Sequence, residues 1–182
     1  MKEIYNKVYD NFDEYDEKFS YKINLIDSEF EKFSKTSKIL DIGCGKGHYI
    51  KHLLNKDFQN ILGVEFSKSC SEKYLQGINH VNEDFLEYSK TISDREYDIC
   101  LCMDVLEHIP YDKIEFMVKS ISRIGDHAIL GIANHSDIFM GEELHLIQEN
   151  SKWWEMLLKK YFSNVENIFQ KKSKFFVFRC SR

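Results

Sequence analysis

One segment of the sequence has glycines spaced closely enough to bring its backbone against a ligand. In DIGCGKG, which starts at Asp41, glycines occupy positions Gly43, Gly45 and Gly47. Glycine carries no Cβ and tolerates left-handed backbone, so such a loop can approach a ligand closely. A helix is expected to begin near Lys46, and the free N–H groups at its start favour a carboxylate. The candidate binding residues of this loop are Asp41, Gly43, Cys44, Gly45 and Gly47.

The loop departs from the two common phosphate-binding patterns. The dinucleotide fingerprint is G-x-G-x-x-G, whereas the third glycine here comes one residue early. In a P-loop the Gly-Lys pair is followed by Ser or Thr, which binds magnesium, but here Gly47 follows that pair. Neither pattern therefore assigns a pyrophosphate or a triphosphate to this loop.

Carboxylates and aromatic residues follow the next two apolar segments. Glu65 stands in GVEFS, eighteen residues after Gly47, where a carboxylate can accept hydrogen bonds from both hydroxyls of a ribose. Phe66 can cover one face of an adenine, and Ser67 follows it. Further on, the pair Asp84-Phe85 offers an acceptor for an exocyclic amine and a second apolar surface. Taken singly, each carboxylate would more often cap a helix or lie on the surface, but together they form an ordered set.

The elements that must position these residues follow from the hydrophobic pattern. Short apolar runs predict strands over 38–43, 60–65, 78–81, 97–103, 127–133, 165–169 and 175–180. Helices are expected near 13–33, 46–55, 68–76, 111–124 and 150–161. Strands that alternate with helices predict a mostly parallel sheet, which binds ligands at the carboxyl ends of its strands. Only QKKSK separates the last two strands, so they should form an antiparallel hairpin.

Length and composition fit one globular domain. The chain has 182 residues, of which 43% are hydrophobic and 30% charged. No apolar run approaches the ~20 residues of a membrane span. The N-terminal segment lacks the apolar core of a signal peptide, so we expect a cytoplasmic protein with no membrane partner. The five cysteines are odd in number and form no CxxC pair, which predicts reduced thiols rather than a disulfide framework or a zinc site.

The ordered set of motifs resembles class I S-adenosylmethionine-dependent methyltransferases. The matching segments are ILDIGCGKGHY, LGVEFS, NEDFLEY, YDICLCMDVLEHI and AILGIANH, and the terminal hairpin matches the last two strands of that family. The resemblance implies an α/β fold, a Rossmann-like seven-stranded mostly parallel sheet with helices on both faces and a C-terminal antiparallel hairpin. It also implies a single methyltransferase domain over 1–182, with a helical cap (1–37), a cofactor-binding core (38–137) and a substrate-side helix and hairpin (138–182).

The same resemblance implies a cofactor, S-adenosylmethionine, and a product, S-adenosylhomocysteine. The glycine loop would surround the methionine moiety, Glu65 would bind the ribose, and the aromatic residues with Asp84 would surround the adenine. Met103 and Asp104 would close the pocket after the fourth strand. The expected cofactor-binding residues are Asp41, Gly43, Cys44, Gly45, Gly47, Glu65, Phe66, Ser67, Asp84, Phe85, Met103 and Asp104.

Methyl transfer needs an aligned nucleophile and a group that removes a proton. The candidate bases are His108, His135 and His145, with Asp104 as a further possibility. His108 lies in MDVLEHIP, which many family members share, so it is either structural or catalytic. In the same motif, Glu107 is expected to order the loop.

A Trp-Trp pair follows His145 in the sequence. Either one of Trp153 and Trp154 packs on the sheet while the other lines the acceptor pocket, or both lie in the core. The His…Trp-Trp arrangement resembles small methyltransferases of bacterial surface-glycan pathways.

A metal-assisted reaction is the alternative to a histidine base. Asp104, Asn134 and Asp137 follow neighbouring strands and offer hard oxygen ligands, as in catechol-type members of the family. Their spacing does not clearly match that subgroup, so no metal ligand is assigned.

The acceptor class is narrowed by motifs that the chain lacks. The only proline, Pro110, precedes Tyr111, so the Pro-Pro-aromatic and Pro-Cys loops of base-methylating members are absent, and nucleic acid is disfavoured. The N-terminal tyrosines, which would form a small cap over the cofactor, are Tyr5, Tyr9, Tyr15 and Tyr21. A small cap suits a compact acceptor, such as a sugar, a nucleotide-linked intermediate or a phosphoryl-linked (phosphoramidate-type) capsule precursor.

The C-terminal segment KKSKFFVFR is basic, and it either faces an anionic small-molecule acceptor or is a solvated surface. A tRNA or protein methyltransferase, and a non-catalytic cofactor-binding partner subunit, are the alternatives. The sequence does not define the oligomeric state.

Overall fold

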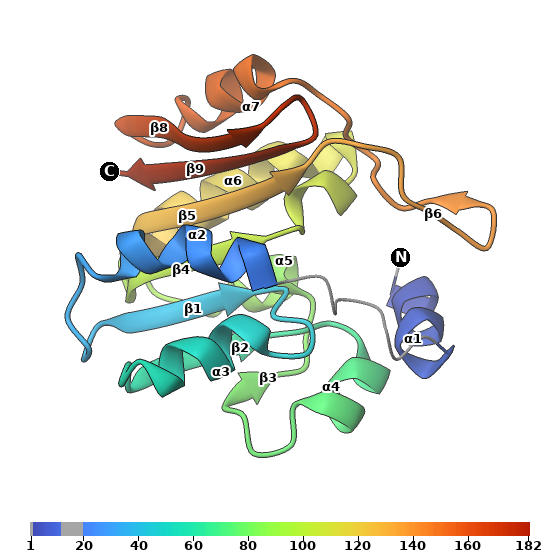
Figure 1. Cartoon of the computed structure of the whole chain (residues 1–182), viewed down its shortest axis with the longest axis horizontal. Coiled ribbons are helices and arrows are strands. Elements are labelled where there is room, and N and C mark those ends of the chain that lie inside the picture. The colour runs from blue at the N-terminus through green and yellow to red at the C-terminus, as the bar shows by residue number, and fades with distance from the viewer. Residues whose placement is uncertain (1, 12–19) are drawn as a thin grey trace. The chain divides into compact units, whose positions relative to one another are not determined.

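The computed structural model describes residues 2–11 and 20–182, whose helices and strands are drawn in Figure 1. The chain divides into two compact units, Met1–Tyr88 and Ser89–Arg182. The glycine loop at 41–47 belongs to the first unit, whereas all three candidate histidines belong to the second.

The first unit contains three parallel strands in the order β3-β2-β1. In chain order its elements are α1 (Lys2–Asn11), α2 (Ser20–Phe30), β1 (Lys38–Ile42), α3 (His48–Asn55), β2 (Asn60–Val64), α4 (Lys68–Tyr74), β3 (His80–Val81) and α5 (Phe85–Tyr88). The register pairs Asp41 of β1 with Gly63 of β2, and Gly63 with His80 of β3. Because parallel strands end at the same edge, the loop after β1 lies beside the residues that follow β2.

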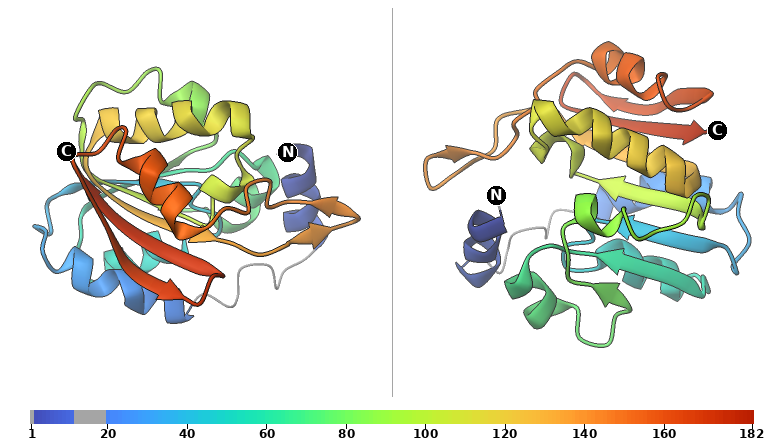
Figure 2. Two further views of the ribbon diagram at one scale, coloured as in Figure 1. Left: turned by 90° about the horizontal axis from the view of Figure 1, so that it is seen from above. Right: turned by 180° about the vertical axis from the view of Figure 1, so that it is seen from behind.

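The second unit contains four strands in the order β4-β5-β9-β8. In chain order its elements are β4 (Tyr97–Met103), η2 (Leu106–His108), α6 (Tyr111–Ile124), β5 (Gly125–Ala133), β6 (Ile138–Phe139), β7 (Glu142–Glu143), α7 (Ser151–Leu158), β8 (Asn164–Lys171) and β9 (Phe175–Ser181). β4 and β5 are parallel, and β9 runs antiparallel to both β5 and β8. The short strands β6 and β7 form a separate hairpin that projects beyond the end of β5 (Figure 2).

The predicted fold class is confirmed. The two units supply the seven strands of a mostly parallel sheet, and its last two strands form the predicted antiparallel pair. One predicted strand is shorter than expected: β3 begins at His80 rather than at Ile78. The N–H of Ile78 donates to the carbonyl of Leu75 in a turn that contains Gly77, which leaves two residues to pair with β2. The organisation as a single domain over 1–182 stays a prediction.

The N-terminal region differs from the single helix expected near 13–33. The described part of that range contains α2, and a helix that the pattern did not predict, α1, precedes it. α1 buries Tyr5, Val8 and Tyr9 on one face, which is the i, i+3, i+4 spacing of an amphipathic helix. Of the cap tyrosines, Tyr15 and the side chain of Tyr21 lie outside the described residues.

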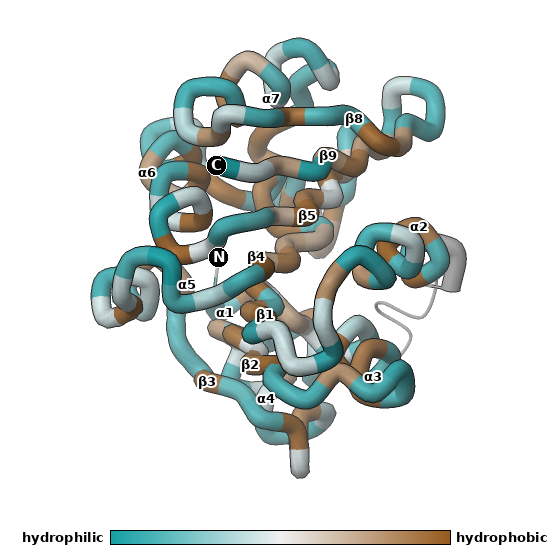
Figure 3. Tube along the Cα trace, turned by 90° about the vertical axis from the view of Figure 1, so that its left-hand side faces the viewer, coloured by the Kyte–Doolittle hydropathy of each residue, from teal (hydrophilic) through white to brown (hydrophobic). Residues whose placement is uncertain are grey.

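The helices cover the strands with apolar faces. In the first unit α3 packs on β2; in the second, α6 packs on β4 and β5, and α7 packs on β8. Figure 3 shows both apolar (brown) and hydrophilic (teal) residues within α2 and α3, as expected for helices with one buried face. Within the described residues, none of the helices has the length and apolar character needed to span a membrane.

Buried thiols and one tryptophan mark the interior of the units. All five cysteines are buried, and none of them forms a disulfide bond in the structure. Trp154 is fully buried, while Trp153 is half-buried and lies edge-on to the Tyr111 ring, with 6.0 Å between ring centroids. One tryptophan therefore belongs to the core and the other to the outer surface of α6 and α7.

Candidate functional site

The glycine loop has the backbone conformation that its spacing predicted. Gly43, Gly45 and Gly47 have φ angles of 66°, 51° and 72°, all in the left-handed region that side chains disfavour. The N–H groups of Gly43 and Cys44 both donate to the carbonyl of Val64, at 2.8 and 3.1 Å. The loop therefore turns over the end of β2 before α3 begins, with Gly47 at the N-cap position.

Glu65 connects this loop to the start of α4. Its Oε2 accepts the backbone N–H of Gly45 at 3.0 Å, and its Oε1 accepts that of Ser67 at 2.8 Å. The residue is only 3% exposed. Each carboxylate oxygen has two lone pairs, so a ribose hydroxyl can still be accepted beside each backbone bond.

Asp41 is a buried carboxyl group at the end of β1. It is 2% exposed, and its Oδ2 has no hydrogen-bond partner among the described residues. Burial, reinforced by the nearby charge of Glu65, raises the pKa of Asp41 to about 8. A buried oxygen without a donor is a costly feature that a ligand carrying N–H groups would relieve.

The other cofactor candidates of the first unit have partners within the protein. Ser67 is the N-cap of α4: its hydroxyl accepts the N–H of Cys70 and donates to the side-chain oxygen of Asn6 at 2.8 Å. Phe66 is half-buried, and its ring centroid lies 5.4 Å from that of Tyr5 on α1. α1, which sequence reasoning missed, thus lies against the residues that follow β2.

Asp84 and Phe85, the acidic-aromatic pair predicted after the third strand, differ in their exposure to solvent. Asp84 is exposed, and its side chain accepts the N–H of Leu86, so it caps α5. Phe85 is buried. The two residues follow β3 as predicted, and their part in adenine binding stays a prediction.

In the second unit, the residue directly after β4 has a left-handed backbone conformation. Met103 is buried, and Asp104 follows it with φ 56°, an unusual angle for a residue with a side chain. The N–H of Asp104 donates to the carbonyl of Gly131 on β5 at 2.9 Å. This hydrogen bond fixes the turn between β4 and η2.

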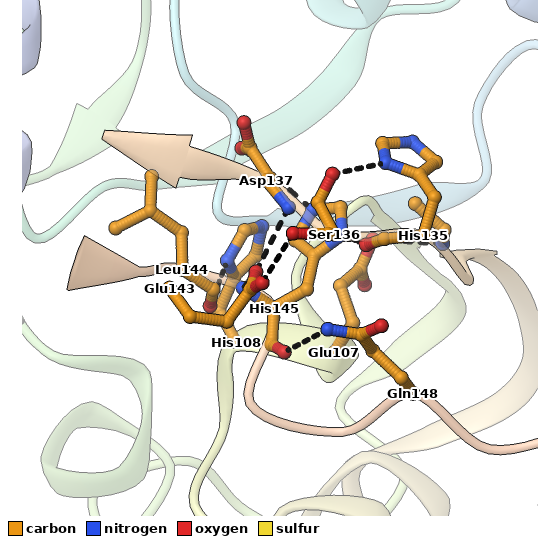
Figure 4. Close-up of polar contacts among 10 residues, drawn as sticks. Glu107, His108, His135, Ser136, Asp137, Glu143, Leu144, His145 and Gln148 are labelled. Atoms are coloured by element: carbon orange, nitrogen blue, oxygen red, sulfur yellow. Dashed lines mark hydrogen bonds and ion pairs between the residues drawn. The ribbon is translucent and has the colours of Figure 1, made fainter. Parts of the chain in front are cut away.

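The structure brings the three candidate histidines together. His145 is central: its ring centroid lies 4.7 Å from that of His108 and 4.8 Å from that of His135. Figure 4 shows how η2, the residues after β5 and the residues after β7 contribute one imidazole each. We call Glu107, His108, His135 and His145 the histidine cluster.

Backbone carbonyl groups orient the rings of His108 and His145. Nδ1 of His108 lies 2.8 Å from the carbonyl oxygen of Leu144, and Nδ1 of His145 lies 2.6 Å from that of His135. A carbonyl oxygen only accepts, so each Nδ1 carries a hydrogen in these contacts, and the ring of His108 has a further contact with the backbone of Asp104. Burial, with a contribution from His145, lowers the pKa of His108 to about 3, and burial also lowers the pKa of His145.

His135 differs from the inner pair because its side chain is exposed. Its Nδ1 lies 3.0 Å from the carbonyl oxygen of Ser136, the next residue. Asp137 lies near the cluster, with Oδ2 3.8 Å from Nε2 of His145.

Two acidic residues order the backbone around the cluster. Glu107 is fully buried; its Oε1 accepts the N–H of Ala133 at 2.8 Å, and its carbonyl accepts the N–H of Ile147 at 2.9 Å. Glu143 accepts the hydroxyl of Ser136 and the N–H groups of Asp137 and His145. Sequence reasoning missed Glu143, and a two-residue strand gives no periodic signal that could have revealed it.

Asp104, Asn134 and Asp137, considered above as oxygen ligands of a metal ion, are not the residues that the structure groups together. The Asn134 side chain donates to the carbonyl of Ser173 at 2.8 Å, and its N–H donates to the carbonyl of Lys174, so it is bound to the β8–β9 turn. Instead, the described residues bring ligand atoms of Glu107, His108 and His145 within 4.8 Å of one another.

Several proteins with similar sequences are named as methyltransferases. Residues 12–171 match a family model described as a methyltransferase domain. An EEF1A lysine methyltransferase 2 from Danio rerio is 31% identical over 98 residues, covering 48% of this chain and 41% of the relative. A ubiquinone biosynthesis O-methyltransferase from Rickettsia bellii is 28% identical over 111 residues, covering 59% and 45%. The chain thus matches less than half the length of these relatives.

Solved structures share the fold at low sequence identity. A SAM dependent methyltransferase from Archaeoglobus fulgidus aligns with a TM-score of 0.70 and 16% identity, over 92% of this chain and 98% of that chain. A 1,6-didemethyltoxoflavin-N1-methyltransferase from Burkholderia thailandensis aligns with a TM-score of 0.72 and 12% identity, over 100% and 86%. At sequence identities this low, the structural similarity establishes the fold alone.

Proposed function

Because the chain belongs to the methyltransferase-domain family, we propose that it transfers a methyl group from S-adenosylmethionine to an oxygen or nitrogen atom of a small molecule. When bound, S-adenosylmethionine supplies an electrophilic sulfonium methyl group, and its transfer leaves S-adenosylhomocysteine. The chain has to hold the donor, align the nucleophile and take up a proton.

The observation that carries this proposal is the loop held by Glu65. Three left-handed glycines expose backbone at the end of β1, and the buried carboxyl group of Asp41 has an oxygen without a donor. A methionine moiety carries an ammonium group, which can supply that hydrogen bond. Glu65 keeps acceptor capacity for the ribose hydroxyls while it holds the N–H of Gly45.

The histidine cluster is our proposal for the acceptor side of the reaction. We assign proton removal to His135, because its ring is exposed, whereas burial lowers the pKa of His108 and of His145. A positioned base of this kind contributes about 10²–10⁴-fold to the rate. The imidazole of His135 would take up the proton that the acceptor's oxygen or nitrogen atom loses when it is methylated.

The acceptor we propose is compact and carries negative charge. Lys171, Lys172 and Lys174, at the β8–β9 turn, are exposed and form a basic segment in the same unit as the histidine cluster. A sugar, a nucleotide-linked intermediate or a phosphoryl-linked capsule precursor would fit this charge. Two similar proteins have names that point to small molecules, one to ubiquinone biosynthesis and one to 1,6-didemethyltoxoflavin.

A lysine side chain of a protein is the second candidate acceptor. It is favoured by the relative named as a lysine methyltransferase, which aligns over 48% of this chain. A lysine amine would have to lose a proton before transfer, so the same need for a base applies.

Calorimetry with S-adenosylmethionine and S-adenosylhomocysteine tests the cofactor part of the proposal. We expect both to bind, and the absence of heat with either ligand on folded protein would reject it. Release of S-adenosylhomocysteine during incubation with a panel of sugar nucleotides, phosphorylated sugars and catechols then tests the acceptor class. Transfer to a lysine-rich protein alone would favour the second candidate.

A further inference from the structure

We propose that Glu107, His108 and His145 form a binding site for a divalent transition-metal ion of the Zn²⁺ class. The first observation is their proximity: one ligand atom from each lies within 4.8 Å of the others. Ligand atoms around a tetrahedral zinc ion lie about 3.4 Å apart, given Zn–N and Zn–O distances of about 2.1 Å. Movements of roughly 1 Å, within the reach of small side-chain rotations, would bring the three groups to that geometry.

The hydrogen bonds of both histidines suit metal binding. Their Nδ1 atoms donate to the carbonyl oxygens of Leu144 and His135, so Nε2 is the atom of each ring that would bind the metal ion. Metal-binding histidines almost always donate their other ring N–H to a carbonyl or carboxylate in this way. Two backbone carbonyls therefore act as the supporting groups of the proposed site.

The burial of the cluster favours the same function. His145 is 5% exposed and Glu107 is fully buried, so bulk water competes little for their ligand atoms. Neutral imidazole and ionised carboxylate are the forms that bind a metal ion. Oε1 of Glu107 accepts the N–H of Ala133, which sets the orientation of the carboxylate toward the two rings.

The donor set indicates the class of ion and the kind of site. Two imidazoles and one carboxylate suit Zn²⁺, Co²⁺ or Fe²⁺ better than Mg²⁺ or Ca²⁺, which prefer oxygen ligands. Three protein ligands leave at least one coordination position open, as in catalytic metal sites. Asp137, with Oδ2 3.8 Å from Nε2 of His145, lies at the border of the site and can bind a metal-bound water.

The role of the ion rests on the proposed function. A metal ion at this cluster would bind the oxygen nucleophile of the acceptor and lower its pKa, so that His135 receives the proton more readily. Metal binding itself does not depend on S-adenosylmethionine and can be measured without it. The two proposals can therefore fail separately.

The binding test uses untagged protein, treated with a chelator and then titrated with Zn²⁺ or Co²⁺ in a calorimeter. We expect one bound ion, at least a tenfold tighter affinity for Zn²⁺ than for Mg²⁺, and d–d absorption typical of nitrogen ligands with Co²⁺. His145→Gln and Glu107→Gln should weaken Zn²⁺ binding by at least about tenfold. His127→Gln is the matched control, since His127 lies on β5 in the same unit but outside the cluster.

Three results would overturn the site. They are no saturable Zn²⁺ binding by the wild type, an equal loss of Zn²⁺ affinity in His127→Gln and His145→Gln, or bound Co²⁺ with only the weak d–d absorption of the hydrated ion. Circular dichroism shows whether each variant is folded, and the Co²⁺ spectrum of the wild type decides the matter if a variant is not. If Zn²⁺ binds but S-adenosylmethionine does not, the metal site stands and the proposed function fails.

Discussion

The carboxylate of Glu65 accepts the backbone N–H of Gly45 across 3.0 Å, so the residue after β2 determines the position of the loop after β1. The same carboxylate holds the N–H of Ser67, the N-cap of α4. One buried side chain thus couples the glycine loop to the next helix. Any ligand that binds this loop depends on Glu65 through backbone position as well as through direct contact.

Replacement of Glu65 should therefore affect both stability and binding. Glu65→Ala leaves two buried N–H groups without acceptors, at a cost of about 1–3 kcal/mol each, and should weaken S-adenosylmethionine binding more than tenfold. Urea unfolding and calorimetry measure the two effects. Glu72→Ala is the control, because Glu72 lies exposed on α4. An affinity equal to that of the wild type would remove Glu65 from the cofactor site.

Asp41 should make stability depend on pH in an unusual direction. Its pKa is raised to about 8 in the folded chain, above the value of about 3.9 for an unfolded aspartate. Between these two values the unfolded state releases the proton first, so the free energy of unfolding falls as pH rises. Asp41→Asn should therefore be more stable than the wild type above pH 8, with the difference vanishing near pH 4.

Thermal melts from pH 4 to pH 9 measure this effect of Asp41. The same variant should bind S-adenosylmethionine less tightly, because an amide cannot pair with an ammonium group as a carboxylate does. A gain in stability with a loss of binding is the pattern expected of a site residue. Parallel stability curves for the two proteins across this pH range would contradict the prediction.

Gly47 should tolerate a methyl group less well than another left-handed glycine. A Cβ at Gly47 would lie 2.7 Å from Cδ1 of Ile78 and 3.0 Å from Cδ2 of Leu75, whereas a Cβ at Gly77 would meet nothing within 4 Å. Their φ angles are similar, 72° and 78°, so the backbone strain of alanine is similar at both sites. The excess destabilisation of Gly47→Ala over Gly77→Ala then measures the crowding alone.

We expect that excess to be about 1–3 kcal/mol in urea unfolding, the usual cost of overpacking. Gly77→Ala should cost about 1–2 kcal/mol from backbone strain. Equal losses for both variants would show that Ile78 and Leu75 move aside without cost.

His135→Ala should slow methyl transfer without changing cofactor affinity. Loss of a general base lowers kcat by about 10²–10⁴-fold, while the cofactor loop lies in the other unit and should bind as before. The release of S-adenosylhomocysteine, with the acceptor that the panel identifies, gives kcat, and calorimetry gives the affinity. His80→Ala serves as the control variant. If kcat of His135→Ala stays within twofold of the wild-type value, His135 is not the general base.

Patterns of a few residues predicted most of the fold, because burial imposes a visible periodicity on strands and helices. The near-continuous apolar run of β4 and the short QKKSK connection led to the correct sheet and hairpin. α1 was missed because this short helix of ten residues buries only Tyr5, Val8 and Tyr9, which is a weak periodic signal. The β6–β7 hairpin was missed because two-residue strands are too short for any period.

The candidate site could be predicted in part. The loop glycines were identified from spacing alone, and the three histidines were proposed individually before the structure brought their rings together. The combination of Glu107 with His108 and His145 could not be foreseen, because it depends on the path of the chain between Ala133 and Ile147. That path is set by hydrogen bonds to Glu107 and Glu143, and the hydrophobic periodicity of the sequence does not predict such bonds.

Because all five thiols are buried, the alkylation rate of each cysteine measures how often the structure around it opens. Cys44 and Cys70 lie in the first unit, and Cys100, Cys102 and Cys180 lie in the second. Alkylating reagents modify the thiolate, and only when it is reached by solvent, so each cysteine reacts at a rate set by the opening of its surroundings. Mass spectrometry of alkylated peptides would then report the opening free energy of each unit separately, and would show which unit S-adenosylmethionine protects.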